Sequence, residues 1–171
     1  MEEETMSRFK ILALIALFTF ALGLALASDA LAGEKIKFRA VWYTVKFEPL
    51  NVPGEEGRIL YLVEWKGILT VFQGSKLLDG MVGSVVGYGD LNTKTGTGSG
   101  EGVIEWTDRD GDRIYWAYEA KAVKGVTSGP ITVIRGTGKF EGLKGRATWI
   151  NYEPAPNQTY TDWDGELEWS R

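Results

Sequence analysis

Polar and apolar residues alternate with a period of two along most of the chain after residue 33. In Arg113–Ala122, for example, one face carries apolar and aromatic side chains and the other carries mostly polar ones. This period is typical of a β-strand with one buried face. Such segments recur between glycine-rich or polar turns, and we expect about eight strands, at residues 35–43, 58–72, 81–91, 102–107, 113–122, 130–135, 146–152 and 163–169.

About eight strands at regular spacing, with no helical period among them, favour a sandwich or a barrel. We expect an all-β fold, an eight-stranded antiparallel β-barrel. Gly67 predicts a bulge or bend within the second strand, and Thr95–Gly100 predicts a flexible loop. Charged residues on the outward faces, such as Glu119 and Lys121, argue against a barrel embedded in lipid.

The first 32 residues follow a different pattern. Ser7–Lys10 forms a short basic flank, Ile11–Ala27 is uncharged and rich in Leu and Ala, and Ala30–Ala32 places small residues at the positions that a signal peptidase reads. This order of segments is that of a secretory signal. Because Glu2–Glu4 are unusual in such a flank, Met6 is an alternative start.

The sequence therefore predicts a cleaved signal peptide at 1–32 and a single barrel domain at 33–171. The alternative is a retained anchor, since an apolar run of about 17 residues lies near the lower limit for spanning a bilayer. With cleavage, we expect a secreted or periplasmic protein that has no further association with a membrane.

Composition narrows the chemistry of the domain. After residue 32 the chain carries 17 Lys and Arg against 19 Asp and Glu, a net charge of −2, so it has no electrostatic basis for binding nucleic acid. The chain contains neither Cys nor His. This excludes a Ser-His-Asp triad, a cysteine nucleophile and thiolate or imidazole metal sites. We expect no metal and no cofactor.

Two polar motifs have plain structural interpretations. Asp108–Asp112 resembles a calcium loop, but its glycine is at the wrong position for an EF-hand, and Asp-Gly between alternating segments favours a hairpin turn. Gly136–Gly145 lacks the Lys-Ser/Thr ending of a phosphate-binding loop and is interpreted as a connection between strands.

Aromatic residues dominate the faces that we assign to the interior. They either fill the barrel or line a pocket closed by a few polar groups. Glu64 lies in a strand that is apolar on both faces, so its direction stays open, and an inward Glu64 would be a buried carboxylate with a raised pKa. The candidate ligand-binding residues are Trp42, Thr44, Glu64, Trp106, Trp116, Tyr118, Trp149 and Asn151. No residue is assigned a catalytic role.

The stretch Asp108–Arg146 resembles the allene oxide cyclase-like barrels, a calycin-like group. The resemblance rests on an acidic hairpin, an aromatic strand, and Gly-Thr-Gly-Lys-Phe-Glu-Gly-Leu-Lys-Gly at Gly136–Gly145. This group includes plant allene oxide cyclases, dirigent proteins and many exported bacterial proteins of unknown role. The resemblance implies an eight-stranded barrel with a hydrophobic lumen; the plant members form trimers and act on hydrophobic small molecules by confining them.

Three functions remain open. The first is a non-catalytic exported barrel that binds a small hydrophobic or aromatic molecule in its lumen. The second is a cyclase or isomerase that acts by confinement and uses an inward acid or base, Glu64 or Tyr118. The third is a protein that self-associates, as a dimer or trimer, through a sheet face, with Val41, Tyr43 and Val45 as the seam.

Overall fold

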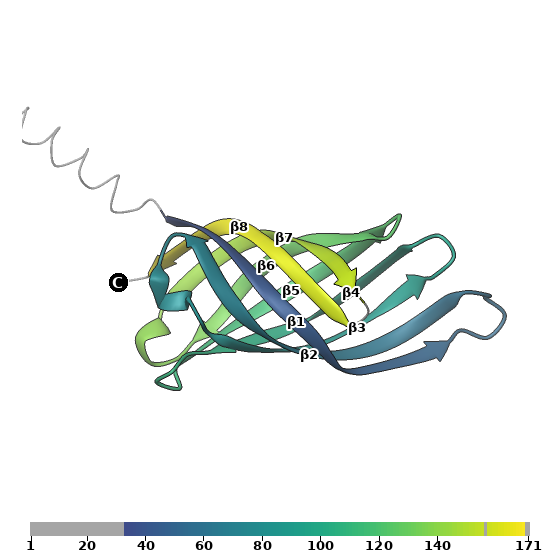
Figure 1. Cartoon of the computed structure of the whole chain (residues 1–171), viewed down its shortest axis with the longest axis horizontal. Helices are drawn as coiled ribbons and strands as arrows, with labels where there is room; N and C mark the ends of the chain where they lie inside the picture. Colours follow the sequence, from purple (N-terminus) through teal and green to yellow (C-terminus); the bar gives the residue numbers. More distant parts are fainter. Residues whose placement is uncertain (1–32, 156, 170–171) are drawn as a thin grey trace, which may run out of the picture. The chain divides into compact units, whose positions relative to one another are not determined.

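The computed structural model describes residues 33–155 and 157–169, and these form a closed eight-stranded antiparallel barrel (Figure 1). Each strand pairs with the next, and the last pairs with the first, which confirms the predicted fold class. The predicted signal peptide lies outside the described residues. The strands are β1 (Glu34–Asn51), β2 (Arg58–Gln73), β3 (Val82–Asn92), β4 (Thr97–Thr107), β5 (Arg113–Val123), β6 (Val126–Gly136), β7 (Leu143–Ala155) and β8 (Gln158–Trp169).

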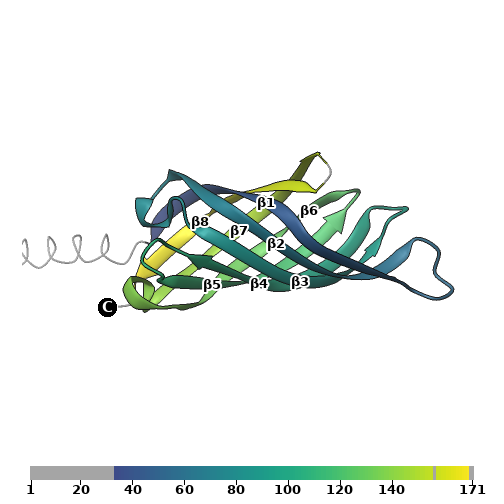
Figure 2. The same cartoon turned by 60° about the horizontal axis from the view of Figure 1, so that its bottom comes forward.

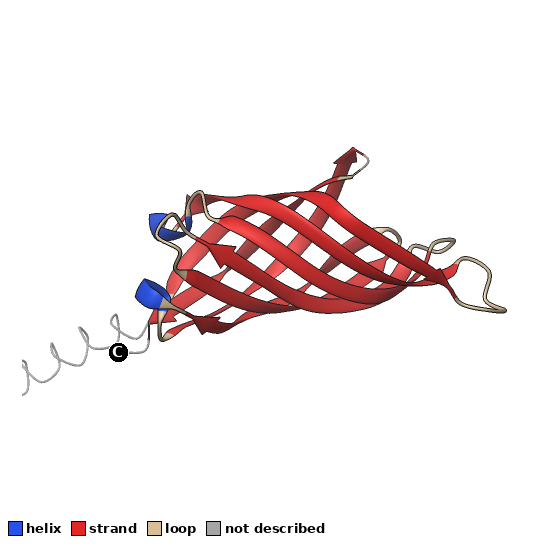
Figure 3. Cartoon of the chain, turned by 90° about the horizontal axis from the view of Figure 1, so that it is seen from below, coloured by secondary structure: helices blue, strands red, loops and turns tan. Residues whose placement is uncertain are grey.

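The two ends of the barrel differ. One end carries the short 3-10 helices η1 (Lys76–Leu78) and η2 (Gly138–Phe140) together with the turn Asp108–Asp112, and we call it the 3-10 end (Figure 3). The other end carries the four hairpin connections, and we call it the hairpin end. The β1–β2 hairpin extends furthest at this end (Figures 1 and 2). In the described part of the chain, no helix is long and apolar enough to cross a membrane.

Two local predictions were wrong. Thr97–Gly100 does not belong to a loop but starts β4, where it pairs with Gly89–Asn92 of β3. Gly67 pairs regularly with Trp42, and the nearby register shift lies instead between Thr44 and Lys46.

The inward faces of the strands form one apolar core. Leu78, Met81, Phe140 and Leu143 close the 3-10 end and are all buried. Above them, aromatic rings contact one another. The ring centroids of Phe38 and Trp163 lie 4.6 Å apart, and Trp116 meets Trp163 edge to face. The interior is therefore filled by large side chains, as expected for a narrow barrel.

Large rings in the lumen lie against glycines of the neighbouring strand. A side chain at Gly67 would collide with the ring of Trp42, its direct cross-strand partner. The glycines are needed because the rings lie across the backbone at these positions. The same arrangement places Trp106 over Gly83, Tyr118 over Gly87 and Gly102, and Tyr61 over Gly89 and Gly100.

The outer surface carries both ion pairs and exposed apolar side chains. On β8 and the adjoining part of β1, opposite charges pair across the strands, as in the bidentate contact of Arg39 with Asp162. On β1, the predicted seam residues Val41, Tyr43 and Val45 are about half exposed.

Candidate functional site

A small cavity lies in the lumen, between the filled core and the hairpin end. Its volume is about 20 Å³, which is enough for one water-sized group. Aromatic rings from five strands surround it. The lining residues are Trp42, Trp65, Val85, Ile104, Tyr118, Ile131, Trp149, Thr161 and Trp163.

Thr161 organises the polar groups around this cavity. Its hydroxyl oxygen accepts one hydrogen bond from Trp42 Nε1 at 3.0 Å and a second from Trp163 Nε1 at 2.7 Å. A hydroxyl oxygen has two lone pairs, so both acceptor positions are used. Thr161 therefore holds two indole rings in place and offers the cavity only its O–H donor.

Trp149 offers a second donor. The side chain lines the cavity and is 9% exposed. Its Nε1 is buried and has no hydrogen-bond partner among the described residues. A buried N–H without an acceptor is unfavourable by about 1–3 kcal/mol, so this group marks a place where an acceptor atom would be stabilised.

Tyr118 closes the cavity on the β5 side. Its ring meets that of Trp149 edge to face, with centroids 5.9 Å apart. Burial, and secondarily the nearby Tyr61, raises the pKa of the Tyr118 phenol. The hydroxyl therefore stays protonated at neutral pH and is a donor rather than a base.

Seven of the eight predicted site residues lie at inward positions of the barrel, in three groups. Trp42, Tyr118 and Trp149 line the cavity. Trp106 and Trp116 are buried in the core below it but do not line it. Two more lie at inward strand positions nearer the hairpin end and are half-buried; these are Thr44 and Asn151.

Glu64 does not face the lumen. Its neighbour Trp65 lines the cavity, and successive residues of a strand point to opposite faces, so Glu64 lies on the outer surface. The direction that the sequence left open is therefore outward, and Glu64 is not among the residues that line the cavity, although it was named as a candidate ligand-binding residue. No carboxylate of residues 33–155 or 157–169 lines the cavity.

Sequence reasoning missed three of the most informative lining residues. Trp65 was passed over because its strand is apolar on both faces. Thr161 and Trp163 continue an inward alternation through Thr159, but the last strand was expected to start only at 163. The alternation of Thr159, Thr161 and Trp163 was the signal that could have found the second and third.

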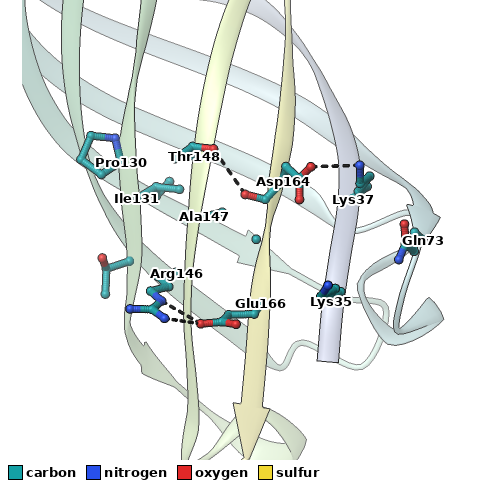
Figure 4. Close-up of a pocket in the computed structure, with 12 residues that line it drawn as sticks. Lys35, Lys37, Gln73, Pro130, Ile131, Arg146, Ala147, Thr148, Asp164 and Glu166 are labelled. Atoms are coloured by element: carbon teal, nitrogen blue, oxygen red, sulfur yellow. Dashed lines mark hydrogen bonds and ion pairs between the residues drawn. The ribbon is translucent and has the colours of Figure 1, made fainter. Parts of the chain in front are cut away.

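A larger hollow lies outside the barrel, across β6, β7, β8 and β1 (Figure 4). Its volume is about 750 Å³, but it is open to solvent and most of its charged side chains pair with one another. Arg146 pairs with Glu166 at 2.6 Å, and Lys37 pairs with Asp164 at 3.0 Å. The described residues that line this outer hollow include no buried polar atom without a partner, so we place the candidate site in the lumen.

Comparisons with known proteins support the fold alone. No protein-family model matches the sequence, and no curated protein matches it. Among solved structures, the chain is similar to a protein of unknown function from the DUF3224 family of Shewanella oneidensis MR-1, with a TM-score of 0.53 and 14% sequence identity. The alignment covers 81% of this chain and 100% of that chain. It lends no specific support to an allene oxide cyclase-like assignment.

Proposed function

We propose that the barrel binds a small, mostly apolar molecule in its lumen and contacts one acceptor oxygen of that molecule through the indole N–H of Trp149. The observation that carries this proposal is the buried, unpartnered Trp149 Nε1 at the wall of the cavity. A pocket of aromatic walls with a few oriented polar groups is the usual form of a small-molecule site.

The polar groups around the cavity favour a neutral ligand with an acceptor. Trp149 Nε1 and the Thr161 hydroxyl can only donate, because the acceptor positions of Thr161 are already used, whereas the Tyr118 hydroxyl can donate or accept. Aromatic cages also bind quaternary ammonium groups, but N–H donors at the wall disfavour a cation. A ketone, aldehyde, ester or ether oxygen fits this arrangement best.

The size of the cavity sets a condition on binding. Sites that enclose organic ligands have volumes of about 300–1,000 Å³, far above the 20 Å³ found here. A ligand must therefore displace a ring on the hairpin side. Trp65 is half-buried and is the ring that we expect to move, because the other aromatic rings that line the cavity are all buried.

Catalysis by confinement receives less support from this geometry. It requires an acid or base beside the substrate. Glu64 faces outward, and the raised pKa of Tyr118 makes its phenol a poor base and a weak acid. Binding without a chemical step therefore accounts better for the groups that line the lumen.

Export is part of the same proposal. The basic flank, apolar run and Ala30–Ala32 motif support a cleaved signal, although they fall outside the described residues. The resemblance of Asp108–Arg146 to allene oxide cyclase-like barrels also supports a hydrophobic lumen, as an expectation carried by that resemblance.

Two probes of the same shape test the proposal. Acetophenone carries a carbonyl oxygen and ethylbenzene does not, and both are titrated against the intrinsic tryptophan fluorescence. We expect the dissociation constant of acetophenone to be lower than that of ethylbenzene by about 2- to 12-fold, because one additional hydrogen bond stabilises its complex. Trp149→Phe, which keeps a ring but removes the N–H, should bring acetophenone to the affinity of ethylbenzene.

Trp169→Phe is the matched control, because Trp169 lies at the 3-10 end and is partly exposed. It should leave both affinities unchanged. If neither probe perturbs the fluorescence at millimolar concentration, or if Trp149→Phe leaves the preference for the ketone intact, the proposal is wrong. Preferential binding of phenyltrimethylammonium would replace it with the cation alternative.

A further inference from the structure

The outer face of β2 and β3 carries apolar side chains that no residue in 33–155 or 157–169 covers. Ile68 pairs with Val82 across the two strands, and three positions earlier in the outward alternation of β2, Leu62 pairs with Tyr88. Ile68, Val82 and Tyr88 are 51%, 59% and 56% exposed. Branched and aromatic side chains are usually less exposed than this in a monomer, and a cluster of them marks an interaction surface.

Two charges lie between these apolar pairs. Glu64 and Lys66 occupy the outward positions of β2 between Leu62 and Ile68. Neither forms an ion pair with any residue in the described part of the chain, although Lys37 and Arg39 on β1 and Arg146 on β7 all do. The face therefore offers one unpaired charge of each sign, in a fixed order along one strand.

This order is self-complementary under a two-fold axis. If the axis lies in the plane between the two copies, passes over the backbone of Trp65 and is perpendicular to the strand, β2 lies over β2 of the second copy and runs the opposite way. Lys66 then faces Glu64 of the second copy, and Ile68 faces its Leu62. Because Ile68 pairs with Val82 and Leu62 pairs with Tyr88 within each copy, Val82 of β3 then faces Tyr88 of the second copy.

We infer that the barrel forms a two-fold symmetric dimer through the outer face of β2 and β3. Such a contact is isologous and closes on itself, as in most soluble homodimers. Each unpaired charge meets an opposite charge, and each exposed apolar pair meets another. The net charge of −2 after residue 32 opposes this association only weakly.

The available surface fits a small dimer interface. Val86 and the predicted seam residues Val41 and Tyr43 are also half exposed and extend this apolar face beyond the two pairs, and a large exposed apolar patch marks an interaction surface. A standard interface buries about 800 Å² per partner. The predicted seam on β1 is thereby placed at the edge of the contact, with its centre on β2.

Sedimentation velocity over a concentration series tests the inference, with the chain from Gly33 onward, which contains every strand of the closed barrel. We expect a dimer in the micromolar range. Ile68→Glu places a carboxylate opposite Leu62 and should weaken the dimer more than about tenfold. The matched control is Ile134→Glu on β6, where the isoleucine is 56% exposed on the opposite side of the barrel; it should dimerise normally.

A charge exchange tests the geometry itself. Lys66→Glu and Glu64→Lys each place like charges opposite one another, and each should weaken the dimer about tenfold or more. The double variant restores opposite charges across the axis and should recover most of the affinity. A fold defect would not be repaired in this way, and far-ultraviolet circular dichroism of all variants checks that the barrel is intact.

Three outcomes overturn the inference. These are a wild-type protein that stays monomeric at several hundred micromolar, a dimer that survives Ile68→Glu, and a double charge exchange that fails to recover either single variant. A trimer that is lost in Ile68→Glu would keep the surface but overturn the two-fold axis. The lumen proposal concerns the opposite face of the same strands and is unaffected by any of these results.

Discussion

Lys139 neutralises the acidic turn between β4 and β5. Its Nζ contacts Asp108 and lies 2.7 Å from Asp110, while the backbone N–H of Lys139 donates to Asp112. The side chain of Asp108 is only 7% exposed. The turn expected from the sequence is therefore present, and a lysine ammonium from η2 occupies the position between the carboxylates that a bound cation would require.

Because of this contact, the stability of the fold depends on the ionisation of the Asp108 carboxylate at acidic pH. Burial raises the pKa, but hydrogen bonds from Lys139 and from the backbone of Asp112 and Asp110 outweigh it and leave the pKa below its ordinary value. A lowered folded-state pKa contributes stability above about pH 4, and this stability is lost as the pH falls through the folded value.

We therefore predict that Asp108→Asn lowers the melting temperature at pH 7 by roughly 3 °C or more. The difference from wild type should shrink as the pH falls below about 4. Asp164→Asn is the control, since that carboxylate is 65% exposed and its pair with Lys37 should contribute little. Thermal unfolding followed by circular dichroism from pH 7 to pH 2.5 measures both, and a difference that is constant over this range would contradict the prediction.

At the scale of elements, the packing of rings against glycines joins β3, β4 and β5. Tyr118 reaches across Gly102, its direct partner on β4, to Gly87 on β3. The ring of Tyr118 and the two glycines beneath it therefore help to fix how these three strands align. The many glycines of this sequence therefore serve the packing of the lumen as well as the turns.

We predict that Gly87→Ala is destabilising because the new methyl group collides with the Tyr118 hydroxyl. Overpacking of this kind costs about 1–3 kcal/mol, or roughly 3–9 °C in melting temperature for a domain of this size. Tyr118→Phe removes the colliding oxygen, so the alanine should be much less harmful in that background.

A glycine far from Tyr118 supplies the control for this double variant. Gly145 packs against Leu167 near the 3-10 end. Gly145→Ala should be equally destabilising with and without Tyr118→Phe, because the two sites share no contact. Equal effects of Gly87→Ala in both backgrounds would show that the phenol is not the constraint.

The elements were predictable from sequence where one face is apolar and the other polar. In β5 this contrast is strong, and the inward direction of Trp116 and Tyr118 was correct. In β2 both faces are apolar, one filling the lumen and the other left exposed, so alternation could not orient Glu64. Gly98 and Gly100 gave Thr97–Gly100 the composition of a loop, although both lie within β4, where Gly98 packs against the backbone of β3 and Gly100 against the phenol of Tyr61.

At the scale of the whole molecule, the lumen and the outer face of β2 belong to the same strand. Trp65 lines the cavity while Glu64 and Lys66 face outward on either side of it. Alternation along one strand thus supplies both proposed surfaces. The cavity could not be predicted from sequence, because its size depends on how rings from five strands pack together.

The start of the mature chain is a prediction at this scale too. We expect the exported protein to begin at Gly33, one residue before β1 begins at Glu34. Intact-mass spectrometry of the protein recovered from an exporting host measures this directly. Ala32→Leu should block processing at this position, whereas Ala40→Leu, inside β1, should not affect it. A mature mass that retains residues 1–32 would instead favour the anchor.

The pairing of β1 with β8 has a consequence for the time course of folding. It joins Glu34 to Leu167, whereas every other pairing joins consecutive strands. Closing so long a loop is slow, because its entropy is lost before the new contacts form. Until β8 docks, β1 keeps an open edge and the tryptophans of the lumen face water. We therefore expect barrel closure to be the late, rate-limiting event, and the open sheet to be the form that aggregates or that a chaperone recognises.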